Sequence, residues 1–135
     1  MALTNLTWTL TALGAVVVLI TRTRLRATEA QSGVTEVPKK VVNAHTVAGV
    51  IALVLWIWTL VGSPVWVGAL ALLAWWVVTL VGLMILARWL PSAGSHSTDA
   101  TDDALAQGPG LSILGHVGML AGVAFFTWAF LADKI

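Results

Sequence analysis

Two histidines in the apolar part of the chain are the residues best suited to chemistry. His45 and His116 each stand a short way inside a long apolar stretch. At a helical rise of about 1.5 Å per residue, both imidazoles would lie roughly 6 to 8 Å below the same face of a membrane. Because histidine is a usual ligand of haem iron, two imidazoles at equal depth on separate helices are candidate axial ligands of a b-type haem.

The residues around these histidines extend the comparison. Gly49 follows His45 by one helical turn and would leave room for a porphyrin, and nearby basic residues would meet its propionates. In His45, Gly49 and His116 the chain resembles the four-helix membrane cytochromes that hold haem between histidines on separate helices. The resemblance implies a haem b cofactor and electron transfer. The chain departs from that pattern at Leu120, where a glycine would follow His116, and in lacking a second histidine pair near the opposite face.

A simpler interpretation of the histidines needs no cofactor. His45 and His116, with Asn43 and Ser112, would form hydrogen bonds between helices near the membrane interface. Such bonds contribute about 0.6 kcal/mol each on average. The sequence alone favours this interpretation, with haem binding as the alternative.

Several other kinds of chemistry are disfavoured by the sequence. The absence of cysteine excludes disulfides and thiolate sites, and a net charge of +1 gives no argument for nucleic-acid binding. The predicted spans contain no Asp, Glu, Lys or Arg, which a proton pump or charged ion pathway would need. No catalytic constellation is visible, so we expect no enzyme.

The acidic segment 92–108, with His96, Asp99, Asp102 and Asp103, is expected to be a solvated loop rather than a metal site.

The apolar stretches determine the predicted fold. Of the 135 residues, 59% are hydrophobic and 10% charged, and the mean hydropathy is +0.93. A bilayer core needs about 20 apolar helical residues to cross. We therefore predict an all-α membrane protein, a single polytopic domain over residues 1–135 with four transmembrane helices in an antiparallel up-and-down bundle. The predicted spans are residues 3–20, 41–61, 65–87 and 111–131, with a tight hairpin at Gly62, Ser63 and Pro64.

The basic residues predict the orientation of these spans. Nearly all flank one side, and only Lys134 falls on the other, so the loops 21–40 and 88–110 are expected in the cytoplasm and both termini outside. The first span has its positive charges after its apolar core, so we expect an uncleaved helix rather than a signal peptide. The composition is typical of a GC-rich bacterial genome, which predicts a multi-pass protein of the bacterial cytoplasmic membrane. The basic residues expected to meet lipid headgroups are Arg22, Arg24, Arg26, Lys39 and Lys40.

Small residues predict where helices pack. Gly118 and Gly122 form a GxxxG pattern that allows close approach of another helix. The full predicted packing or partner faces are Gly115, Gly118 and Gly122 on the fourth span and Thr4, Thr7, Thr11 and Gly14 on the first. Trp75 and Trp76, near mid-membrane, are expected to face lipid or to fill space in the packing. Small size and these faces favour a non-catalytic accessory subunit of a larger membrane complex, such as a lipid or substrate transporter or a respiratory complex.

Overall fold

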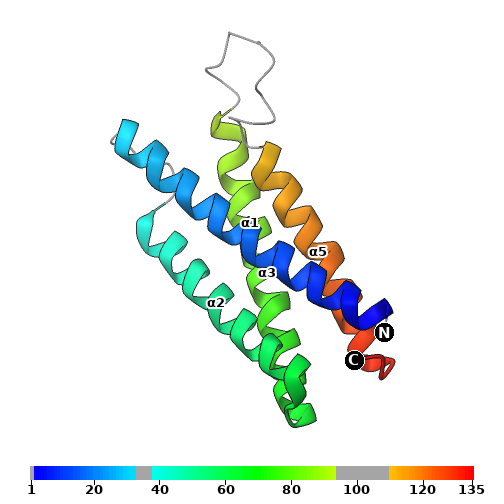
Figure 1. The fold of residues 1–135 in the computed structure, drawn as a ribbon. Helices are drawn as coiled ribbons and strands as arrows, with labels where there is room; N and C mark the ends of the chain where they lie inside the picture. The colour runs from blue at the N-terminus through cyan, green and yellow to red at the C-terminus, as the bar shows by residue number, and fades with distance from the viewer. Residues whose placement is uncertain (1, 33–37, 94–109) are drawn as a thin grey trace.

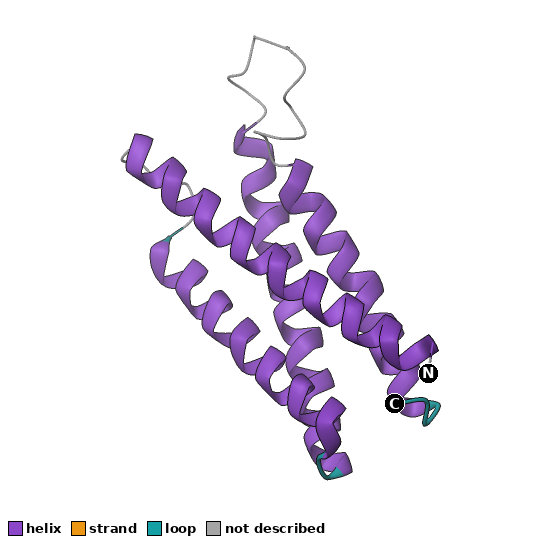
Figure 2. Ribbon diagram, viewed as in Figure 1, coloured by secondary structure: helices purple, strands orange, loops and turns teal. Residues whose placement is uncertain are grey.

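The computed structural model describes residues 2–32, 38–93 and 110–135, and all regular structure in these ranges is α-helical (Figures 1 and 2). Each of its four helices contains a stretch long and apolar enough to cross a membrane. The predicted all-helical class with four candidate spans is therefore confirmed. The helices are α1 (Ala2–Ser32), α2 (Lys39–Gly62), α3 (Val65–Ala93) and α5 (Gly110–Leu131). The candidate spans within them are Ala2–Leu19, Lys40–Gly62, Val65–Ala87 and Ile113–Leu131.

Two helices continue beyond the spans predicted from the sequence. Helix α1 runs on to Ser32, and α3 runs through Pro91 to Ala93. A helix satisfies its own backbone hydrogen bonds, and the Arg, Leu, Ala, Glu and Gln residues after the first span are good helix formers. The limit of the apolar stretch therefore does not mark the end of α1. The acidic residues predicted to form a solvated loop, together with His96, lie outside the described residues.

The turn between α2 and α3 is as tight as predicted. Gly62 has a φ of 105°, a conformation that glycine adopts readily and other residues rarely. Ser63 is extended and Pro64 precedes α3, where its carbonyl accepts a hydrogen bond of 2.9 Å from the Val67 amide. This short link makes α2 and α3 neighbours along their lengths.

Helix α3 occupies the centre of the arrangement. It packs against α2 and α5, while α2 and α5 make no close backbone contact with each other and α1 contacts both of them (Figure 1). The buried core lies around the stacked rings of Trp56 and Phe126, whose centroids are 4.6 Å apart. The other buried members of this core are Ala52, Ala71, Leu72, Trp75, Val78 and Val123.

Two tryptophan–threonine hydrogen bonds connect helices inside this apolar bundle. The Trp56 indole donates to Thr11 Oγ1 of α1 at 3.1 Å, and the Trp76 indole donates to Thr127 Oγ1 of α5 at 3.0 Å. Each threonine hydroxyl in turn donates to the carbonyl four residues earlier in its own helix. Each hydroxyl proton is therefore donated within its own helix, and the hydroxyl oxygen can still accept a hydrogen bond from the indole.

Candidate cofactor site

The two candidate histidines meet, although the backbones of the helices that carry them make no close contact. His45 projects from α2 and His116 from α5, and their ring centroids are 6.2 Å apart with 22° between the ring planes. Both side chains are half-buried. The equal depth expected from the sequence therefore brings the two imidazoles together beside α3.

Gly82 of α3 is the point at which both imidazoles converge. A Cβ atom at this position would lie 2.6 Å from Nε2 and Cδ2 of His116 and 3.0 Å from Cε1 of His45. Any side chain at residue 82 would therefore overlap both rings. The glycine is required here because the histidines occupy the volume that a side chain would fill.

One ring nitrogen at this site is unsatisfied. His45 Nδ1 is buried and has no hydrogen-bond partner within the described part of the chain. A buried polar atom without a partner is costly, and more so in an apolar surrounding. The interhelical hydrogen bonding favoured by the sequence therefore does not account for this nitrogen.

The two histidines suit a metal whose remaining ligands come from a cofactor rather than from the protein. Among the described residues no group of three or more His, Cys, Asp or Glu side chains is placed to hold a metal ion. Haem differs from a bare ion, since its macrocycle supplies the equatorial ligands and the protein adds axial ones such as histidine. The two histidine rings, with centroids 6.2 Å apart, are the donors that the described residues offer to such a group.

Gly49 does not have the position expected from the sequence pattern. It is buried, and an added Cβ would lie 3.7 Å from Val78 Cγ1, an ordinary packing distance. Gly49 therefore borders α3, whereas Gly82, which the sequence reasoning missed, lies against the histidines. The depth argument used for the histidines would have found Gly82, because it stands about one and a half turns before the end of the third apolar span.

The basic residues near the site are only partly described. Arg22 donates a hydrogen bond to Oδ1 of Asn43, which ties α1 to α2 two residues before His45. Asn43, expected to serve the histidines, therefore has an arginine as a partner. Lys40 is exposed. The side chains of Arg24, Arg26 and Lys39, also predicted to meet lipid headgroups, and of Ser112 lie outside the described residues.

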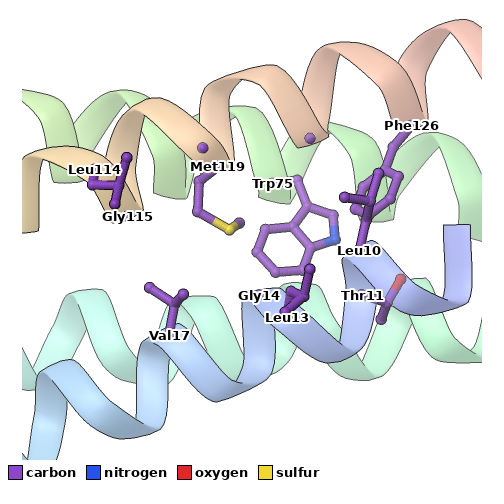
Figure 3. Close-up of a pocket in the computed structure, with 12 residues that line it drawn as sticks. Leu10, Thr11, Leu13, Gly14, Val17, Trp75, Leu114, Gly115, Met119 and Phe126 are labelled. Carbon is purple, nitrogen blue, oxygen red and sulfur yellow. The ribbon is translucent and has the colours of Figure 1, made fainter. Parts of the chain in front are cut away.

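The predicted small-residue faces of α1 and α5 largely face each other. Thr7, Thr11 and Gly14 are buried, whereas Thr4 is exposed. An added Cβ at Gly14 would lie 3.4 Å from Met119 Sδ, and one at Gly115 would lie 2.9 Å from Val17 Cγ1. At Gly118 and Gly122 it would meet nothing within 4 Å. The two helices enclose a cavity of about 230 Å³ beside these open glycines (Figure 3).

Comparisons with protein families, with curated proteins and with solved structures find no match to this chain. The function proposed below is therefore argued from the arrangement of its own residues.

Proposed function

We propose that this chain is a b-type haem-binding, electron-transfer membrane protein in which His45 and His116 are the axial ligands. The observation that carries the proposal is the convergence of two imidazoles, from helices whose backbones make no close contact, at the side-chain-free position Gly82. Haem ligation requires a nitrogen donor from each histidine. It would also use the ring of His45, whose Nδ1 is otherwise unsatisfied.

Each part of the site has a distinct role in this proposal. Bound haem would supply one-electron chemistry at its iron. His45 and His116 would hold the iron, and the apolar span residues around them would exclude water. Arg22, which donates a hydrogen bond to Asn43, would supply a cation for a haem propionate. The Gly82 backbone lies beside both imidazole rings, so a side chain at this position would compete with the bound group for space.

The proposal includes a placement in the membrane. We infer that the spans alternate in direction, that both termini lie outside, and that the residues between α1 and α2 and between α3 and α5 face the cytoplasm. The excess of Arg and Lys in those two connections supports this orientation. The histidine pair then lies near the cytoplasmic side of a bacterial cytoplasmic membrane. A single haem at that depth passes electrons to or from a partner and does not carry them across the bilayer alone.

The visible spectrum of the purified protein tests the proposal. The full chain is expressed with a haem precursor, purified in mild detergent, and assayed for haem per chain and for reduced-minus-oxidised α and Soret bands. We expect about one haem per chain and its loss in both His45→Ala and His116→Ala. His96→Ala is the matched control, since it removes the third histidine of the chain outside the apolar spans, and it should keep the spectrum. A colourless, folded protein, or haem retained in both span variants, would reject the proposal.

A second candidate is the non-catalytic accessory subunit of a larger membrane complex. The open GxxxG face of α5 supports it, because an added Cβ at Gly118 or Gly122 meets no other part of the described chain. Gentle purification from native membranes tests this role. Stoichiometric co-purification with a larger complex, lost in Gly118→Leu, would support it, and a chain isolated alone under the same conditions would contradict it.

A further inference from the structure

The cavity between α1, α3 and α5 contains a buried hydrogen-bond donor. Trp75 is only 2% exposed, its ring lines the cavity, and its Nε1 has no partner within the described residues. Figure 3 shows the indole between Met119 of α5 and Gly14 of α1, with its nitrogen turned toward Leu10 and Thr11. An indole N–H in an apolar surrounding needs an acceptor, because an unmet buried donor loses the hydrogen bond that it would make in water.

No side chain in residues 2–32, 38–93 and 110–135 supplies that acceptor. Thr11 also lines the cavity, but its hydroxyl donates to the Thr7 carbonyl and already accepts from the Trp56 indole. The neighbouring Trp76, by contrast, has its own threonine acceptor at 3.0 Å. Two adjacent tryptophans at similar depth therefore differ in that the Trp76 indole nitrogen is paired, whereas that of Trp75, whose ring lines the cavity, is unused.

The depth of Trp75 restricts what the occupant can be. Trp75 lies near the middle of the candidate span Val65–Ala87. The ester carbonyls of phospholipids belong to the interfacial region outside the roughly 30 Å hydrocarbon core. Acyl chains reach mid-span but have no acceptor. A molecule that carries a carbonyl into the hydrocarbon region would supply the acceptor.

The shape and lining of the cavity favour a flat ring. Its volume of about 230 Å³ is below the roughly 300 to 1,000 Å³ of pockets for larger ligands, so a head group fits rather than a whole lipid. The indole of Trp75 and the ring of Phe126 offer aromatic surfaces, and the Met119 thioether makes favourable contacts with aromatic rings. Gly118 and Gly122 leave the α5 side open.

We propose that this cavity binds the head group of a membrane-soluble quinone, with the Trp75 indole donating a hydrogen bond to a quinone carbonyl oxygen. The isoprenoid tail of such a molecule would leave between α1 and α5 into the lipid. The proposal concerns binding alone and stands independently of haem at the histidine pair.

Equilibrium binding of 2,3-dimethyl-1,4-naphthoquinone to the purified full chain tests this site. We expect saturable binding that weakens about ten-fold in Trp75→Phe, the effect of one buried hydrogen bond. Trp76→Phe is the matched control and should leave the affinity unchanged, because its indole is already paired. Gly122→Leu, which places a side chain in open space at the cavity, should abolish saturable binding.

Two further measurements keep the test decisive. The carbonyl-free 2,3-dimethylnaphthalene should not displace the quinone, and His116→Ala should still bind it, which separates this site from the haem proposal. Circular dichroism and gel filtration report whether each variant folds. If Trp75→Phe does not fold, the Gly122→Leu variant and the competition with the hydrocarbon test the quinone site instead. Unchanged affinity in folded Trp75→Phe or Gly122→Leu, equal competition by the hydrocarbon, or a partner helix cross-linked at Gly122→Cys in native membranes would overturn the proposal.

Discussion

The imidazole rings of His45 and His116 lie 6.2 Å apart, centroid to centroid, although α3 stands between the helices that carry them. Both rings lie against α3 at Gly82, where the absence of a side chain leaves the volume that the rings occupy. Two imidazoles from distant parts of the chain, positioned beside a third helix, are the arrangement on which the proposed haem site depends.

The substitution Gly82→Ala should separate the two imidazoles. Its Cβ would lie 2.6 Å from His116 Nε2, so at least one ring must leave its position. We expect loss of haem binding and a destabilisation of about 1 to 3 kcal/mol, as is typical of overpacking. Thermal unfolding in detergent and the haem content of the purified variant measure the two effects.

Gly49→Ala is the matched control for Gly82→Ala. It makes the same change on a neighbouring helix, but its Cβ would meet Val78 Cγ1 at an ordinary 3.7 Å. Haem content should stay at the wild-type level. If Gly49→Ala lost haem while Gly82→Ala kept it, the convergence point would be wrong.

Sequence patterns predicted the spans well because a helix that crosses a membrane needs about 20 apolar residues in a row. The apolar stretch ending near Val61 and the helix-terminating Gly62 and Pro64 fixed the hairpin, and the structure has both. The end of α1 was missed, because the residues after Thr21 favour a helix whether or not lipid surrounds them. Helix length beyond the bilayer depends on local propensity, which hydropathy does not measure.

The candidate site was predictable only in part. Equal depth identified His45 and His116 as a pair, but depth says nothing about which faces of the helices turn inward. The role of Gly82 depends on how α3 is rotated between α2 and α5. The unused donor of Trp75 likewise follows from packing, since in the sequence it is indistinguishable from Trp76, which the structure pairs with Thr127.

A double-mutant cycle should measure the hydrogen bond that ties α1 to α2 at mid-span. The Trp56 indole donates to Thr11 Oγ1 at 3.1 Å, and both side chains are buried. Trp56→Phe, Thr11→Val and the double variant should give a coupling energy of about 0.6 kcal/mol by reversible unfolding in mixed micelles. A coupling energy indistinguishable from zero would show that this bond does not hold α1 in place.

Gly68→Ala should destabilise the packing of α3 against α5. An added Cβ would fall 2.6 Å from Cζ of Phe130 and 3.0 Å from Cγ2 of Thr59. We expect a loss of about 1 to 3 kcal/mol in the free energy of unfolding. Gly118→Ala, with open space around its Cβ, is the control and should be neutral or stabilise by up to about 1 kcal/mol. Equal effects of the two substitutions would contradict the close contact at Gly68.

Single cysteines should report opposite sides of the membrane for the C-terminal ends of α1 and α2. The chain has no cysteine of its own, so no background labelling arises. A membrane-impermeant thiol reagent applied to intact cells should label Ser63→Cys and Lys134→Cys but reach Ser32→Cys only after the cells are broken. Labelling of Ser63→Cys and Ser32→Cys from the same side would contradict the proposed topology.

Axial ligation of iron by the histidine pair is tested most directly by electron paramagnetic resonance of the oxidised, haem-loaded protein. The account predicts a low-spin ferric signal typical of two imidazole ligands, a high-spin signal in His116→Gly, and return of the low-spin signal when free imidazole is added to that variant. A low-spin signal that survives both His45→Gly and His116→Gly, or haem that is high-spin in the unmodified protein, would contradict it.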